Sequence, residues 1–198
     1  MKQKIIQALM STNRGNMDKM VEYLENEGFF EAPASTKFHG NYEGGLAEHS
    51  WNVYQMLNKF CEMFNIDIPE SSRIIAALLH DVCKINQYIY DPFTKNYKWN
   101  KSNDVGHANL SIERIKKHIE LIEIEETMIR YHMGLYGSHE YNTESWQHSE
   151  YSLKEVMDVF HRNNKALIFY FADHFCAAFI EKTRLQKELE EKEQLSKD

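Results

Sequence analysis

The chain has 198 residues, 42% of them hydrophobic, and a formal net charge of −7. This length and apolar content predict one soluble globular domain with a substantial core. No stretch approaches the roughly eighteen uncharged apolar residues of a membrane-spanning helix, which excludes such a helix, and the negative charge argues against a broad surface that follows nucleic-acid phosphates.

Hydrophobic spacing predicts a protein built almost entirely of helices. Proline is scarce and glycine is confined to a few junctions. Helical patterns run over residues 3–10, 16–26, 46–64, 70–84, 107–119, 123–133, 152–161 and 164–190. Because there is no internal repeat or low-complexity linker, we expect one all-α domain over 1–198, with N-terminal helices over 1–28, a core over about 30–180 and a charged tail over 181–198.

The charged tail begins at Glu181 and has leucines only at positions 185, 189 and 195. Such sparse apolar spacing predicts a solvated continuation of the last helix. A short coiled contact with a partner is the alternative interpretation.

One segment, residues 87–100, breaks the helical pattern. Tyr88 and Tyr90 alternate on one side of an Asp-Pro turn, and Tyr97 and Trp99 alternate on the other. This pattern predicts a short β-hairpin. It could simply cover the bundle, or it could form a wall of a substrate pocket that offers aromatic faces to a ring.

Two acids stand in helices that are otherwise apolar on nearly every side. Asp81 follows His80 at the end of the run Arg73 to Cys83, and Asp173 interrupts the run Ala166 to Ile180. An unpaired buried charge costs several kcal/mol, so these acids require compensation, and a metal ion is the usual source. Adjacent helical residues point about 100° apart, so His80 and Asp81 can share a cation only near a helix end.

Three further histidines could complete such a site. His49 lies on the inward face of an amphipathic helix, in register with Leu46 and Val53. His107 and His132 follow in two intervening segments. The chain order is thus His49, His80-Asp81, His107, His132 and Asp173. One acid in an apolar helix could be a hydrogen-bonded polar group of the core, but two such acids with four histidines are not explained in that way.

This set resembles the HD-domain superfamily of metal-dependent phosphohydrolases, whose ligand order is His, His-Asp, further His, then Asp. The stretches that look like its motif blocks are Gly44-Gly45-Leu46-Ala47-Glu48-His49-Ser50, His80-Asp81-Val82-Cys83-Lys84, Gly106-His107 and Ala172-Asp173. The resemblance covers roughly residues 30 to 180 and implies an HD-domain helical bundle. The chain looks most like bacterial and phage HD proteins of unassigned substrate. The HD domain of certain 3′-to-5′ exoribonucleases is also similar, but those often have a second histidine where this chain has Met133.

Imidazole and carboxylate ligands suit one or two divalent transition metal ions, Fe, Mn, Ni, Co or Zn, better than calcium. We assign His49, His80, Asp81 and Asp173 to a first metal. His107 and His132, with Asp81 bridging, would hold a second. Two metals about 3.5–4 Å apart can hold a hydroxide nucleophile between them. They can also stabilise both the attacking and the leaving oxygen in a displacement at phosphorus.

Three further side chains are candidates for contact with a substrate. Lys84 stands one helical turn after Asp81, where the superfamily also places a lysine, so it is expected to act in catalysis by steadying a phosphate. Arg130 and His39 are weaker candidates for substrate binding. Lysine near a helix end also has an electrostatic explanation through the helix dipole.

The cysteines and the remaining histidines have simpler interpretations. Cys61, Cys83 and Cys176 are odd in number, lack CxxC spacing and lie in apolar patterns, so we expect reduced core residues. The N-terminus also lacks a signal-peptide apolar segment, so the expected compartment is the cytoplasm. The histidines left out of the predicted site are His118, His139, His148, His161 and His174.

The resemblance implies a phosphohydrolase that uses a metal-activated hydroxide on a small-molecule phosphoester, such as a nucleotide. A di-iron oxygenase is the first alternative, because some HD-type oxygenases share this ligand pattern. A non-catalytic metal- or nucleotide-binding module is the second. No membrane is expected as a partner, the charge argues against nucleic acid, and a homo-oligomer is compatible with the sequence.

Overall fold

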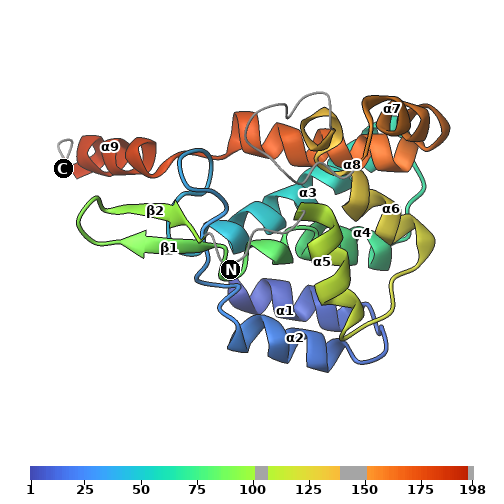
Figure 1. The fold of residues 1–198 in the computed structure, drawn as a ribbon, viewed down its shortest axis with the longest axis horizontal. Coiled ribbons are helices and arrows are strands. Elements are labelled where there is room, and N and C mark those ends of the chain that lie inside the picture. Colours follow the sequence, from blue (N-terminus) through green and yellow to red (C-terminus); the bar gives the residue numbers. More distant parts are fainter. Residues whose placement is uncertain (101–106, 139–150, 196–198) are drawn as a thin grey trace.

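The computed structural model describes residues 1–100, 107–138 and 151–195, and within this part the chain is a bundle of helices with one small hairpin (Figure 1). The helices are α1 (Lys2–Ser11), α2 (Met17–Asn26), α3 (Gly45–Phe64), α4 (Glu70–Leu79), α5 (His107–Lys116), α6 (Glu123–Tyr131), α7 (Leu153–Arg162), α8 (Asn164–Phe175) and α9 (Arg184–Leu195). Shorter turns are the 3₁₀ helices η1 (Val82–Lys84) and η3 (Gly134–Gly137) and the π-helical η4 (Cys176–Ile180). The predicted all-α class is confirmed.

Helices α3 and α4 form the centre of the bundle. In Figure 1, α1 and α2 lie together on one side of this centre, and α7 and α8 lie on the opposite side. Helix α3 packs against α4 and α8, and α6 packs against α4 and α8. Leu46, Val53 and Leu57 of α3 and Ile75 and Leu78 of α4 are fully buried, as the apolar spacing of both helices requires.

The predicted hairpin is present. Strands β1 (Tyr88–Asp91) and β2 (Asn96–Trp99) pair antiparallel, with Tyr88 opposite Trp99 and Tyr90 opposite Tyr97. The ring centroids of these pairs are 5.6 Å and 5.3 Å apart. A hairpin of only two strands is marginally stable by itself, and cross-strand aromatic pairs of this kind stabilise it.

Two glycines fix where α3 begins. Gly44 has a φ of 78°, a conformation that glycine adopts without strain. A Cβ on Gly45 would lie 2.0 Å from the carbonyl oxygen of Gly40, so no larger residue fits there unless the backbone shifts. This close approach sets the register in which His49 enters the core one turn later.

Two predicted helices are divided in the structure. The α-helix predicted over 70–84 ends at Leu79, and a 3₁₀ turn follows. The helix predicted over 164–190 ends in a π-helical turn, and residues 181–183 are not helical. Residues 181–195 of the tail are therefore not a continuation of the last helix, because Glu181 turns inward and α9 starts separately.

Among the described residues no helix is both long and apolar enough to cross a membrane. All three cysteines are free and buried.

Candidate metal centre

Side chains from five helices meet in one buried cluster. His49 comes from α3, His80 and Asp81 follow α4, His107 opens α5, His132 follows α6, and Asp173 lies in α8. His49, His80, Asp81 and His132 are at most 1% exposed. The structure thus brings together every residue that the sequence predicted as a metal ligand.

Asp81 stands in the middle of the cluster and uses its two carboxylate oxygens differently. Its Oδ2 lies 3.5 Å from Nε2 of His49 and 3.3 Å from Nε2 of His80. Its Oδ1 lies 2.8 Å from Nε2 of His107 and 3.5 Å from Nε2 of His132. One carboxylate therefore faces two pairs of histidines, which is the arrangement of a ligand that bridges two positions.

Asp173 joins the cluster from helix α8. Its Oδ1 lies 3.1 Å from Nε2 of His49 and 3.8 Å from Nε2 of His80. His49 Nε2 is therefore close to both acids. The two acids that stood alone in apolar helices belong to the same site.

The outer nitrogens of three histidines are held by the protein. Nδ1 of His80 donates to the carbonyl of Ala77 at 2.9 Å, and Nδ1 of His132 donates to the carbonyl of Ile129 at 2.6 Å. These carbonyls belong to last turns of helices, where no backbone N–H is available for them. With the proton on Nδ1, the lone pair of Nε2 points into the cluster, as metal ligation requires.

The third such nitrogen is Nδ1 of His49, which lies 3.0 Å from both carboxylate oxygens of Glu181. The Glu181 side chain is 1% exposed. Burial would raise the pKa of Glu181, but the charge and hydrogen bond of His49 hold it below its usual value. Sequence reasoning missed Glu181, because an acid at the start of a charged tail gives no local sign of burial.

The chemistry of the site fits a divalent metal ion. Within the described residues, Asp81 Oδ1 and His132 Nε2 are buried and make no well-oriented hydrogen bond. Burial would lower the pKa of His49, yet the neighbouring carboxylates of Glu181 and Asp173 raise it to about 10. The cluster thus attracts positive charge, and its inward Nε2 and carboxylate atoms are ligands that divalent transition metals accept.

Lys84 lies directly beside the cluster. Its Nζ is 2.6 Å from Asp81 Oδ2, and the residue is 8% exposed. Burial would lower the pKa of Lys84, but the charge of Asp81 raises it above its usual value, so the ammonium stays charged. The short turn η1 places this cation three residues after Asp81, on the same side of the turn.

The two weaker substrate candidates differ in position. The His39 ring lies 5.0 Å from the His49 ring, and its buried Nε2 has no hydrogen-bond partner among the described residues. Burial, followed by the charges of His49 and Lys84, lowers the pKa of His39 to about 4. Arg130 instead contacts Glu126 at 2.7 Å and the Asn109 side chain, neither of which is a residue of the ligand cluster.

Cys83 lies at the edge of the cluster, and its Sγ, together with atoms of Asp81 and His107, forms one of the groups that could hold a metal ion. Its Sγ lies 3.2 Å from Nδ1 of His107. In the absence of a metal ion, burial and the charge of Asp81 raise the pKa of Cys83 to about 12. Cys83 is 0% exposed, as expected for a core residue.

The histidines excluded by the sequence analysis have other surroundings where they are described. His118 stacks on Tyr23, and His174 stacks on Tyr136 and Tyr170. His161 is exposed on α7. His139 and His148 lie outside the described residues.

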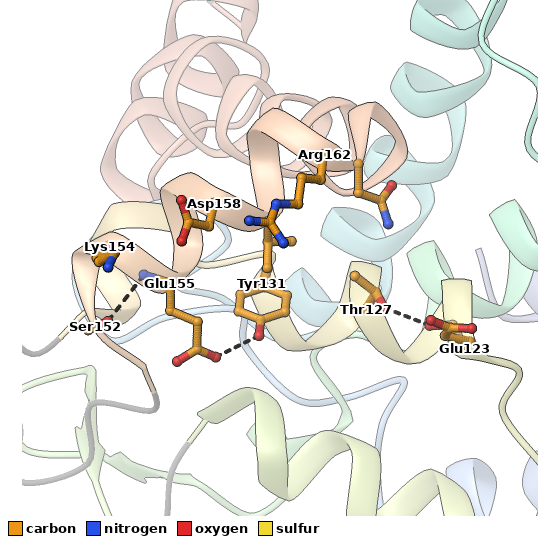
Figure 2. Close-up of a pocket in the computed structure, with 10 residues that line it drawn as sticks. Glu123, Thr127, Tyr131, Ser152, Lys154, Glu155, Asp158 and Arg162 are labelled. Carbon is orange, nitrogen blue, oxygen red and sulfur yellow. Dashed lines mark hydrogen bonds between the residues drawn. The ribbon is translucent and has the colours of Figure 1, made fainter.

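A separate groove of about 510 Å³ lies between α6 and α7 (Figure 2). Tyr131 donates to Glu155 at 2.7 Å across it, and Lys154, Asp158 and Arg162 also line it. None of its lining residues is in the ligand cluster. Its mixed charges do not point to one class of ligand.

Fold and site together define a helical protein with a buried histidine–aspartate cluster that could hold a metal ion. The family model of the HD domain matches residues 46–178, and the chain belongs to this family, whose members bind divalent metals. The dihydroneopterin 2′,3′-cyclic phosphate phosphodiesterase of Methanocaldococcus jannaschii is 30% identical over 139 residues, and the match covers 58% of this chain and 52% of that protein. The chain spans about half the length of this curated relative. No solved structure matches the chain significantly.

Proposed function

We propose that this chain is a metal-dependent phosphohydrolase that cleaves a small, ring-bearing phosphoester. The observation that supports it most is the position of Asp81, whose two oxygens face two separate pairs of histidines. A bridging carboxylate between two imidazole pairs suits two-metal displacement at phosphorus. We assign one metal to His49, His80, Asp81 and Asp173, and a second to His107, His132 and Asp81.

A divalent metal ion bound here would supply a Lewis acid that lowers the pKa of water and withdraws charge from phosphoryl oxygens. Asp81 connects the two halves of the site. Lys84 keeps a buried ammonium 2.6 Å from Asp81 Oδ2, where it can also pair with a phosphate oxygen of the substrate. His39, whose ring lies next to the His49 ring, has a buried Nε2 without a hydrogen-bond partner among the described residues, and this atom could bind the substrate.

The hairpin supports a ring-bearing substrate. Tyr88, its first residue, is close enough to Lys84 and Asp81 for their charges to affect its pKa, which burial raises to about 12. Tyr88 also stacks edge-on with Trp99. Aromatic faces beside a phosphate-binding cation can hold a nucleobase or a pterin-like ring. The relative from M. jannaschii is named for a cyclic phosphodiester of such a ring system, so we propose cyclic and linear phosphodiesters of ring-bearing molecules as the first substrates.

We also propose a cytoplasmic location. The three cysteines are buried and free, which is the usual state of cysteine in a reducing compartment.

The test is a substrate screen on protein loaded separately with Mn, Ni, Co, Fe and Mg, with elemental analysis of the purified protein. We expect a 2′,3′-cyclic phosphate to be opened to a monoester without release of inorganic phosphate. Asp81→Ala should abolish the reaction and weaken metal retention, because the bridging ligand is lost.

Two results would overturn the proposal. Oxygen consumption and a mixed-valent di-iron signal in iron-loaded protein, with no phosphoester cleaved, would assign the chain to the oxygenases instead. Metal binding without turnover of any phosphomonoester or phosphodiester would indicate a binding module.

A further inference from the structure

Glu181 has an environment that its place in the sequence does not predict. It follows the π-helical turn Cys176–Ile180, where the backbone changes from helical to extended, with φ −90° and ψ 142° at Glu181. Both carboxylate oxygens lie 3.0 Å from Nδ1 of His49, and Asn52 donates to Oε1 at 3.3 Å. A glutamate is rarely buried unless it is paired, and here its partner is a residue of the metal centre.

The two nitrogens of His49 face different groups. Nε2 faces Asp81, His80 and Asp173, whereas Nδ1 faces only Glu181 among its described side-chain partners. If Nε2 is to offer its lone pair to a metal, the ring proton must be on Nδ1, and Glu181 is placed to accept it. His80 and His132 use backbone carbonyls for the same purpose. Helix α3 continues past His49, so His49 needs a partner from elsewhere in the chain.

We propose that Glu181 is a positioning residue that fixes the tautomer and ring orientation of His49 for metal binding. The inference rests on the metal centre of the proposed function. It also extends that centre beyond residues 46–178, the part of the chain that matches the family model.

The C-terminal helix holds Glu181 in place. The backbone N–H of Gly40 donates to the carbonyl of Lys182 at 3.2 Å. From α9, Lys187 Nζ lies 2.9 Å from Oε2 of Glu48 and 3.8 Å from the centroid of the Tyr42 ring. Because Glu48 directly precedes His49, α9 is anchored to the same turn of α3 that carries the ligand. These contacts fix residues 181–195 against the start of α3 and so hold the Glu181 carboxylate next to Nδ1 of His49.

The experiment measures metal affinity rather than turnover. Metal-free wild type, Glu181→Gln and Glu181→Ala are titrated with Mn²⁺ by calorimetry and with Co²⁺ by visible absorption. Removing such an outer partner typically weakens metal affinity by roughly 10–100-fold, and we expect this loss in Glu181→Ala, with an altered Co²⁺ spectrum. Glu181→Gln keeps an oxygen acceptor but no charge, so we expect a smaller loss.

Glu125→Gln is the matched control. Glu125 is also a fully buried carboxylate with a charged partner, Arg14 at 2.6 Å, but it lies outside the ligand cluster. This variant should lower thermal stability and leave metal affinity unchanged. A general effect of removing a buried charge would appear in both glutamate positions, whereas a positioning role appears only at 181.

The outcomes separate this inference from the proposed function. If wild type binds metal and the two Glu181 variants bind it equally well with the same spectrum, Glu181 has no positioning role, whatever the catalytic result. If the variants lose affinity but no phosphoester is cleaved, the positioning role stands and the hydrolase proposal fails. Wild type that binds neither metal would overturn both. Should Glu181→Ala fail to fold, the near-isosteric Glu181→Gln carries the decision.

Discussion

Two of the four histidines around Asp81 have the same hydrogen-bond arrangement. His80 and His132 each end a helix and donate Nδ1 to the carbonyl three residues earlier, at 2.9 Å and 2.6 Å. Their Nε2 atoms then approach Asp81 from different sides. A ring fixed by a hydrogen bond loses less freedom when it binds a metal, so the site is organised before any ion enters.

Lys84 allows a direct test of phosphate binding. Its ammonium contacts Asp81 Oδ2 but is not itself a ligand type for a metal. In Lys84→Ala we expect kcat to fall roughly 10²–10³-fold, the loss typical when one electrostatic contact to a transition state is removed, with metal content unchanged by elemental analysis. The exposed Lys192→Ala in α9 is the control and should match wild type. Loss of metal in Lys84→Ala would mean that the lysine maintains the centre instead.

The proposed second metal would depend on His107, which is the most exposed of the four histidines around Asp81. In protein prepared with excess Mn²⁺, His107→Ala should reduce the metal content from about two ions to about one per chain and lower the rate, because two-metal displacement loses one of its braces. Elemental analysis and initial rates measure both effects. Wild type with about one ion per chain, or a His107→Ala variant with an unchanged rate, would contradict the two-metal assignment.

At the level of elements, the site depends on where helices stop. Helix α4 ends at Leu79, so His80 and Asp81 face the same side although they are adjacent in sequence. The apolar pattern predicted this helix and the need for a helix end, but it placed the end at residue 84. The actual end depends on the His80 side chain, which donates to Ala77 and so takes the carbonyl that Asp81 N would use in a continued helix.

The break after α8 could not be predicted from local sequence. Residues 164–180 are apolar enough to predict a buried helix, and the charged residues that follow look like a solvated extension of it. Glu181 is buried only because His49, 132 positions earlier in the chain, is its partner. Periodicity identifies elements and ligand candidates within one helix, whereas a contact over that separation is set by tertiary packing.

The start of α3 gives a test at this scale. A Cβ on Gly45 would approach Gly40 O to 2.0 Å, whereas a Cβ on Gly15 would meet nothing within 4 Å. Overpacking typically costs about 1–3 kcal/mol, so Gly45→Ala should lower the free energy of unfolding by that amount and weaken metal retention through His49. Gly15→Ala should be neutral or slightly stabilising, by up to about 1 kcal/mol. Urea denaturation of the two variants measures the difference, and equal stabilities would show that α3 does not need the close approach.

At the scale of the whole molecule, the N-terminal helices are joined to the core by a buried ion pair. Arg14, between α1 and α2, donates to both carboxylate oxygens of Glu125 in α6, at 2.9 Å and 2.6 Å, and to the carbonyl of Glu120 at 2.6 Å. Ser72 of α4 donates to the same carboxylate at 2.9 Å. These contacts link three parts of the chain around one buried glutamate and support the expectation that residues 1–28 belong to the same domain as the metal centre.

Replacing Arg14 tests that expectation. Removing one partner of a buried pair leaves an uncompensated charge and typically costs about 3–5 kcal/mol, so Arg14→Met should lower the free energy of unfolding by this amount in urea. The control is Lys2→Met, because the Lys2–Glu25 pair is 45% and 40% exposed and should contribute less than about 1 kcal/mol. If the N-terminal helices and the core form one cooperative unit, fluorescence and circular dichroism will report a single transition that shifts as a whole in Arg14→Met. A new early transition, with the core and its bound metal unfolding at the wild-type urea concentration, would instead show that residues 1–28 dock as a separate unit.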